Sequence, residues 1–124
     1  MPHATVIPEL GYANVLVAVD WLCAAFGFTV RLRIANHRAQ LNVGDGAVVV
    51  TDSGSGTRSR VMVRVEDADA HYQRALQQGA HIVAAPATQP YGERQYVVED
   101  LAGHLWTFSE SVSDVDPRDW AGEV

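Results

Sequence analysis

The fold of this chain is decided by residues 14–34, which read NVLVAVDWLCAAFGFTVRLRI. Asn14 is suited to cap the start of a helix over Val15–Phe26, and Gly27 is suited to end it. Only Asp20 is charged within this helix. We therefore expect a core face and a second covered face, for which a subunit contact is one explanation. The following segment, Phe28–Ile34, alternates apolar and polar residues and predicts a half-buried strand.

Further strands are predicted on both sides of this stretch. The segment Ala4–Tyr12 precedes it and contains Val, Ile and Leu together with one Pro, which suits a strand in which the Pro needs no ladder hydrogen bond. Two strands follow it, Arg38–Val43 and Ala47–Thr51, separated by a turn at Gly44–Gly46. The first half of the chain is thus predicted to be ordered β-α-β-β-β.

The second half repeats this order after the Gly- and Ser-rich linker Asp52–Thr57. A strand is predicted over 58–65, and a helix over Ala68–Gln78 that Asp67 caps and Gly79 closes. Three strands are predicted after the helix: His81–Ala85, Tyr91–Glu99 and His104–Ser109.

The predicted fold class is α+β, in one domain over residues 1–124 with two tandem β-α-β-β-β modules. Module 1 covers about 4–51, the linker 52–57 and module 2 about 58–110; an acidic tail follows over 111–124, anchored, if anywhere, by Trp120. Each module is expected to be a four-stranded antiparallel sheet with a helix on one face. The open faces would form cupped half-barrel sheets, paired across a homodimer.

Composition excludes several function classes. Nine Arg and no Lys stand against fifteen acidic residues, and the formal charge of −6 disfavours nucleic acid as a partner. No apolar run approaches the about 20 residues that a membrane span needs, so no membrane partner is expected. The start of the chain, Met1–Ala4, has no export signal, which predicts a cytoplasmic protein. The single Cys23 excludes an internal disulfide.

Three motifs carry a family resemblance: Asp20–Phe28, Val65–Ala70 and Asp100–Phe108. Together with the tandem order, they resemble the vicinal oxygen chelate superfamily over residues 4–110. This group contains glyoxalase I, extradiol dioxygenases, fosfomycin-resistance enzymes and the bleomycin-resistance binding proteins. The resemblance implies a paired-module fold and does not by itself select a reaction.

The resemblance also implies where a metal would be held. In metal-using members the ligands come from the first and last strands of each module, which correspond here to Ile7, Val50, Arg60 and Thr107. None of these is a His, Glu, Asp or Gln that would supply an imidazole or carboxylate-type donor. We therefore expect no metal and no other cofactor.

Strand alternation predicts the lining of the hollow. If Thr107 points inward, so do Leu105 and Ser109, while Trp106 points to the core. The residues predicted to bind ligand are Arg60, Met62, Arg64, Glu9, Tyr91, Thr107 and Val50. The alternatives are that both arginines pair with Glu9 or solvent, that Met62 is core, and that Tyr91 packs its own loop.

No catalytic residue is predicted. The five histidines show no metal-ligand or catalytic spacing, and Cys23 lies among apolar helix residues. The function expected from these observations is metal-independent binding of a drug or natural product, of the bleomycin-resistance type, in clefts of a homodimer. The alternative is an enzyme, a glyoxalase-like lyase or isomerase, with unorthodox metal ligands or with Arg60 and Glu9 as metal-free groups.

Overall fold

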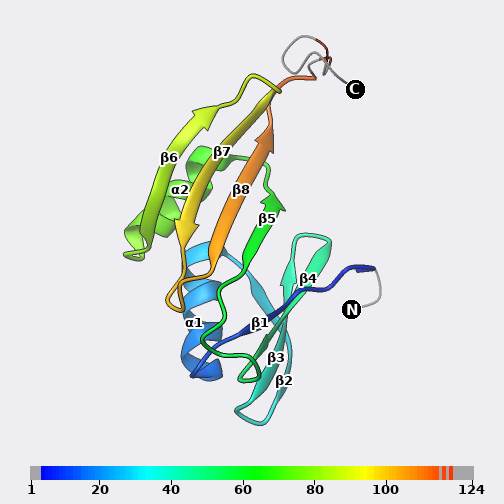
Figure 1. Cartoon of the computed structure of the whole chain (residues 1–124), viewed down its shortest axis with the longest axis vertical. Helices are drawn as coiled ribbons and strands as arrows, with labels where there is room; N and C mark the ends of the chain where they lie inside the picture. The colour runs from blue at the N-terminus through cyan, green and yellow to red at the C-terminus, as the bar shows by residue number, and fades with distance from the viewer. Residues whose placement is uncertain (1–3, 115, 117, 119–124) are drawn as a thin grey trace.

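The computed structural model describes residues 4–114, 116 and 118. Module 1 contains β1 (Glu9–Gly11), α1 (Val15–Phe26), β2 (Thr29–Ile34), β3 (Arg38–Val43) and β4 (Gly46–Thr51). Module 2 contains β5 (Arg60–Arg64), α2 (Ala68–Gln77), β6 (His81–Thr88), β7 (Glu93–Glu99) and β8 (Leu105–Ser111). The predicted α+β class and the tandem β-α-β-β-β order are confirmed (Figure 1).

The helix ends follow the predicted caps. The Asn14 side chain accepts a hydrogen bond from the Val17 N–H at 3.1 Å, and Gly27 ends α1 in the left-handed conformation with φ of 78°. At α2, the Asp67 side chain accepts from the Ala70 N–H at 3.0 Å. These contacts satisfy backbone groups that a helix end leaves free.

The two sheets are mixed, which corrects the expectation of antiparallel units. Their strand orders are β1-β4-β3-β2 and β5-β8-β7-β6, and we call them sheet A and sheet B. β1 pairs with β4, and β5 with β8, in parallel. The reason is that each helix returns the chain to its starting end, so the next strand repeats the direction of the first. Two hairpins later the last strand also has that direction.

A bulge in β2 overturns the predicted single alternation of Phe28–Ile34. The pairing of β2 with β3 shifts between Val30 and Leu32, so Val30 pairs with Leu41 but Leu32 pairs with Gln40. An inserted residue in one strand moves all later side chains to the opposite face. Leu32 therefore lies on the face away from the helices and is exposed.

One hydrophobic core joins both modules. We call the side of each sheet that packs on the helices the helix face, and the opposite side the far face. Figure 1 shows sheet B above sheet A, with α2 behind sheet B. Phe26, which is 3% exposed, ends α1 in module 1, and its ring lies 5.5 Å from Trp106 and 4.9 Å from Phe108 in module 2. Trp106 is fully buried, as predicted.

A buried carboxylate also connects the modules. Asp100, in the β7–β8 turn, accepts hydrogen bonds from the Tyr12 hydroxyl at 2.6 Å and from Nε1 of Trp106 at 3.0 Å. Beside it, Nε2 of His104 donates to the Gly11 carbonyl at 2.8 Å. Gly11 is required here because a Cβ would lie 2.5 Å from the backbone of Gly54.

The C-terminal end of α1 is held by side chains of α2. Arg74 donates to the carbonyls of Ala24 at 2.9 Å and Cys23 at 3.2 Å, and Nε2 of His71 donates to that of Phe26 at 2.9 Å. Positive charge at this end of a helix is favourable. The covering of the second face of α1 is thus partly explained by contacts within the chain, although Leu16 on this helix is exposed.

The structure bears on the expectations for a membrane span and for the two ends of the chain. Within the described residues, no helix is long and apolar enough to cross a membrane. The start of the tail is tied to the loop before β7, because the N–H groups of Val112 and Ser113 both donate to the Gly92 carbonyl. Trp120, the expected tail anchor, lies outside the described residues, as do the first three residues of the segment Met1–Ala4 on which the export argument rested.

Candidate functional site

Three rows of side chains cross the far face of sheet B. The strand pairing places residues of β5, β8, β7 and β6 side by side in each row. The first row is Arg60, Leu105, Glu99 and His81; the middle row is Met62, Thr107, Val97 and Ala84; the third row is Arg64, Ser109, Gln95 and Ala87. An apolar band with one hydroxyl therefore lies between two polar bands.

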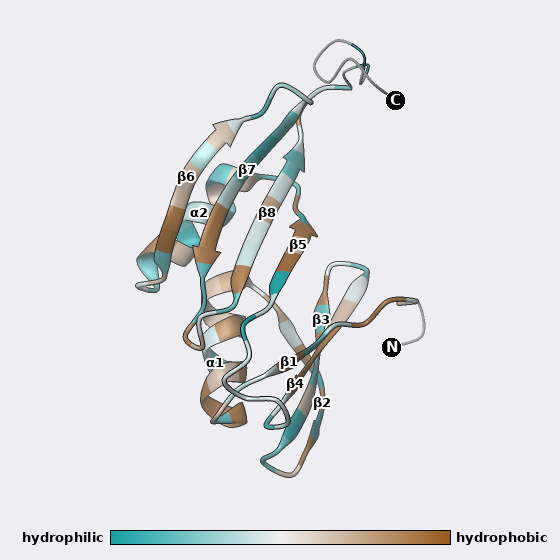
Figure 2. Ribbon diagram, in the orientation of Figure 1, coloured by the Kyte–Doolittle hydropathy of each residue, from teal (hydrophilic) through white to brown (hydrophobic). Residues whose placement is uncertain are grey.

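The middle row is the apolar part of this surface. Met62 is 64% exposed although it lies at the centre of β5. Thr107 and Val97 beside it are half-buried. In Figure 2, β7 changes from hydrophilic along its first half to hydrophobic towards its C-terminal end. Exposed apolar side chains on a sheet face are typical of a surface that a ligand or partner covers.

The third row is a connected polar network. Arg64 forms an ion pair with Glu93 at 2.9 Å, and the Ser109 hydroxyl donates to the same carboxylate at 2.8 Å. The Gln95 amide donates to Ser109 at 3.1 Å and accepts from the Tyr91 hydroxyl at 3.0 Å. Because Glu93 is only 17% exposed, its two partners compensate a largely desolvated charge.

The first row carries charge at its two ends. Nδ1 of His81 donates to the Glu99 carboxylate at 2.8 Å. Arg60 lies at the opposite edge of the sheet, beside a hollow of about 380 Å³ that Arg58 and Gly103 also line. The far face of sheet B thus combines an apolar band, an organised polar band and an edge of positive charge.

The structure brings together five of the seven residues predicted to bind ligand. Arg60, Met62, Arg64 and Thr107 lie on the far face of sheet B, and Tyr91 reaches it through its bond to Gln95. This placement supports a common site and leaves the binding role of each residue as a prediction.

Glu9 and Val50 lie elsewhere. Glu9 is on the far face of sheet A, where it forms an ion pair with Arg38 at 2.9 Å, so it does not pair with Arg60 or Arg64. Val50 is 0% exposed and packs in the core on the helix face, contrary to the expected hollow-lining position. In β4 it is Val49 that pairs with Glu9, one residue away from the position expected from the turn glycine.

The site residues that sequence reasoning missed come from β7. Glu93, Gln95 and Val97 share the far face, because Tyr96 and Val98 between and beside them are buried in the core. The alternation of these residues was a usable signal. The pairing of Gln95 with Ser109 could not be predicted from the sequence, because it depends on how β7 and β8 align.

A second hollow, of about 660 Å³, lies on the helix side between the β3–β4 turn and α2. Its polar lining includes His71 and Arg74, which are already bonded to carbonyls of α1. The Tyr96 hydroxyl also contacts Nδ1 of His71. Since the Phe26 carbonyl only accepts, Nε2 carries the proton and Nδ1 accepts from Tyr96. These groups hold the modules together, so we do not place the site here.

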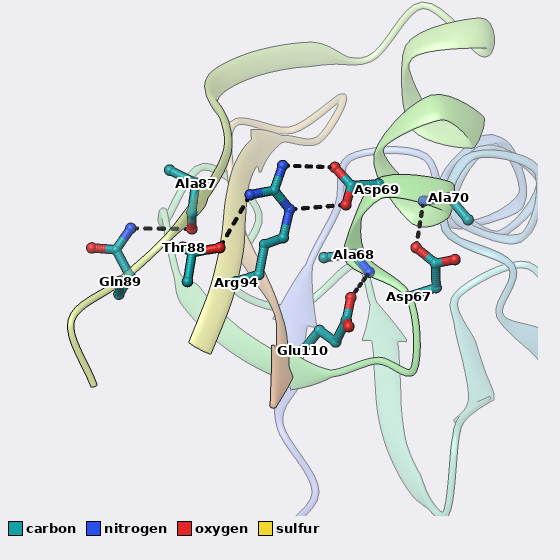
Figure 3. A network of polar contacts seen from close by, with 9 residues as sticks. All are labelled: Asp67, Ala68, Asp69, Ala70, Ala87, Thr88, Gln89, Arg94 and Glu110. Carbon is teal, nitrogen blue, oxygen red and sulfur yellow. Dashed lines mark hydrogen bonds and ion pairs between the residues drawn. The ribbon is translucent and has the colours of Figure 1, made fainter. Parts of the chain in front are cut away.

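The start of α2 is held by a separate network on the helix side (Figure 3). Arg94 donates to both carboxylate oxygens of Asp69, at 2.8 and 3.0 Å, and Glu110 accepts from the Ala68 N–H at 2.8 Å. The bond to Arg94 holds the pKa of Asp69 below its usual value. These contacts anchor the helix and lie on the face opposite the rows.

The side chains that could coordinate a metal ion do not cluster in the described part of the chain. Among residues 4–114, 116 and 118, no three His, Cys, Asp or Glu side chains lie close enough together to hold a metal ion. Both ring nitrogens of His104 are used, since Nδ1 accepts from the Ser59 N–H at 2.9 Å. Burial raises the pKa of the Cys23 thiol. That shift disfavours a reactive thiolate.

His71 is expected to make stability depend on pH. Burial lowers the pKa of His71, and the hydrogen bond to the Phe26 carbonyl, which acts in the opposite direction, only partly offsets this effect. In the unfolded chain it titrates near 6.5, so below about pH 6.5 the unfolded state binds more protons and the free energy of unfolding falls. The free energy of unfolding, measured with urea at several pH values from 8 to 5.5, should therefore fall more steeply with decreasing pH for the wild type than for His71→Gln. Equal slopes would contradict the assignment.

The chain belongs to the Glyoxalase/Bleomycin resistance protein/Dioxygenase superfamily, which matches residues 7–108. This is the vicinal oxygen chelate group that the motifs resemble. TioX from Micromonospora sp. ML1 superposes with a TM-score of 0.80 at 39% identity, over 86% of this chain and 97% of TioX.

More distant and longer proteins are also similar. A lactoylglutathione lyase from Agrobacterium tumefaciens has a TM-score of 0.74 at 15% identity, over 88% of this chain and 94% of that one, and thus shares the fold. The uncharacterized protein Mb0911c of Mycobacterium bovis is 38% identical over 90 residues, 73% of this chain and 57% of that protein. Rv0887c of Mycobacterium tuberculosis has the same identity over 51% of its length. The chain spans about half the length of these curated relatives.

Proposed function

We propose that this protein binds a small organic molecule, a drug or natural product, without metal and without turnover, in the manner of bleomycin-resistance proteins. The observation that carries the proposal is the far face of sheet B, where exposed Met62 lies between two polar rows. Such a lining fits an apolar molecule whose few polar groups are oriented by fixed side chains. Membership of a superfamily that includes bleomycin resistance proteins supports this type of site.

The proposal includes a homodimer. Exposed Leu32 and Ile34 lie on the far face of sheet A, in rows with Gln40 and Arg38. If the far face of sheet A in one copy covers that of sheet B in another, both apolar bands leave water and a cleft forms from two chains. Sedimentation should then give twice the 13.5 kDa of one chain. A monomer at micromolar concentration would contradict this part.

Sequestration as a mode of antibiotic resistance completes the proposal. We expect the protein to act in the cytoplasm, where a captured molecule is kept from its target. The alternative is an enzyme of the same superfamily, a glyoxalase-like lyase or isomerase.

The test is equilibrium binding after dialysis against EDTA. Calorimetric titration with bleomycin and a panel of planar aromatic antibiotics should find a ligand that binds and is recovered unchanged by mass spectrometry. Met62→Glu places a charge in the apolar row and should weaken binding at least about tenfold. Leu76→Glu, on an exposed position of α2, is the matched control.

Two results would argue against metal-independent capture, and a third would argue against the location of the site. Binding that disappears with EDTA would make the function metal-dependent. A chemically altered molecule after incubation would favour the enzyme. Equal binding by Met62→Glu and Leu76→Glu would remove the site from sheet B.

A further inference from the structure

The arginine side chains differ in whether they have a hydrogen-bond or ion-pair partner. Seven of the nine have a hydrogen-bond or ion-pair partner: Arg31, Arg33, Arg38, Arg64, Arg74, Arg94 and Arg118. Within the described residues, the side chains of Arg58 and Arg60 have none. Arg60 lies in the first row of the far face, and Arg58 precedes it by two residues in the chain and lines the same hollow.

The two unpaired guanidinium groups line the same hollow. Its volume is about 380 Å³, and its other lining residues are Ser59, Glu99, Gly103 and Leu105. A Cβ at Gly103 would lie 3.2 Å from Nε of Arg58 and 3.4 Å from Oε1 of Glu99. Since Gly103 has no Cβ, both charged groups can lie close against the β7–β8 turn.

The charge balance inside the hollow is positive. Two guanidinium groups, of Arg58 and Arg60, lie there against the single carboxylate of Glu99, one oxygen of which is bonded to Nδ1 of His81. A guanidinium offers several donors in a plane that matches carboxylate and sulfonate oxygens. The overall charge of −6 acts only weakly here, because exposed charges are screened beyond about 8 Å at physiological salt.

We propose that Arg58 and Arg60 bind an anionic oxygen group, a carboxylate or sulfonate, carried by an aromatic ligand. This inference rests on the proposed function. Adjacent rows on one face of a sheet are about 6.6–6.8 Å apart along the strand, roughly the width of a fused aromatic system. The aromatic body then covers Met62 in the middle row while its anionic group enters the hollow.

Two fluorescent probes that differ in the anionic group test this inference. 1-Anilinonaphthalene-8-sulfonate carries a sulfonate, and N-phenyl-1-naphthylamine has the same aromatic body without it. The wild type should bind the sulfonate about tenfold more tightly than the neutral probe. Arg58→Ala/Arg60→Ala should lose this preference and keep its affinity for the neutral probe. Raising KCl from 50 to 500 mM should weaken sulfonate binding selectively.

Two further variants locate the effect. Arg33→Ala removes one positive charge on the helix side of sheet A, where Arg33 faces Asp20, and should keep the preference. Met62→Glu should weaken binding of the neutral probe. Loss of the preference in Arg33→Ala, or unchanged neutral-probe binding in Met62→Glu, would overturn the inference.

The inference and the proposed function fail in different ways. If the wild type binds both probes equally and Met62→Glu weakens both, the anion site is wrong and the apolar site stands. If the wild type binds neither probe, both proposals are contradicted.

Discussion

Asp100→Ala is expected to lower the free energy of unfolding by about 3–5 kcal/mol. Asp100 is 6% exposed and accepts from the Tyr12 hydroxyl, Nε1 of Trp106 and the N–H groups of Ala102 and His104. Removing the carboxylate leaves buried donors from both modules without an acceptor. Burial and the neighbouring carboxylate raise the pKa of Tyr12, so its hydroxyl remains a donor across the pH range in which proteins fold. Urea unfolding monitored by circular dichroism measures the change.

Two variants separate this effect from loss of a surface charge. Tyr12→Phe removes one donor and keeps the ring, and should cost about 1 kcal/mol. Glu66→Ala removes an exposed carboxylate and should change stability by less than about 0.5 kcal/mol. A cost for Asp100→Ala no greater than that of Glu66→Ala would show that the buried cluster is not structural.

Phe26→Ala is expected to cost about 3–5 kcal/mol, the usual range for removing a buried aromatic ring. The ring of Phe26 lies within 5.6 Å of those of Phe28, Trp106 and Phe108, so its loss leaves a cavity that adjoins both modules. Leu16→Ala on the exposed side of the same helix should cost less than about 1 kcal/mol.

The same packing predicts that the two modules unfold together. Because α1 ends against residues of β8, module 1 cannot lose its helix without exposing the core of module 2. Tryptophan fluorescence and far-ultraviolet circular dichroism should therefore report a single coincident transition in the wild type. Two separate transitions, with Phe26→Ala shifting only one, would contradict a shared core.

Part of the candidate site followed from local pattern. Arg60, Met62 and Arg64 alternate with apolar residues, and Thr107 alternates with Trp106 and Phe108, so their common face was predictable. Val50 failed the same reasoning, because β4 has four consecutive apolar residues, Ala47–Val50, and no alternation marks its faces. In the structure, Glu9 pairs with Val49, which shows that Val49, and not Val50, lies on the far face.

The polar network of the third row was beyond sequence reasoning for a different reason. Glu93, Ser109 and Arg64 come from three strands, and their contacts depend on the relative alignment of β5, β8 and β7. A shift of one residue in either pairing would turn these side chains to the helix face. The bulge that separates Val30 from Leu32 has the same origin, since it appears only in the pairing with β3.

The sequence by itself determined the helix caps at Asn14, Gly27 and Asp67, the tandem order and the faces of β5 and β8. Each of these depends on a residue and its near neighbours in the chain, through backbone hydrogen bonds and side-chain period. Only the tertiary structure decided the parallel end strands, the buried Asp100 and the placement of Arg58 and Arg60 at one hollow. These depend on which distant segments meet, because hydrogen-bond partners and desolvation are set by contacts between strands and modules.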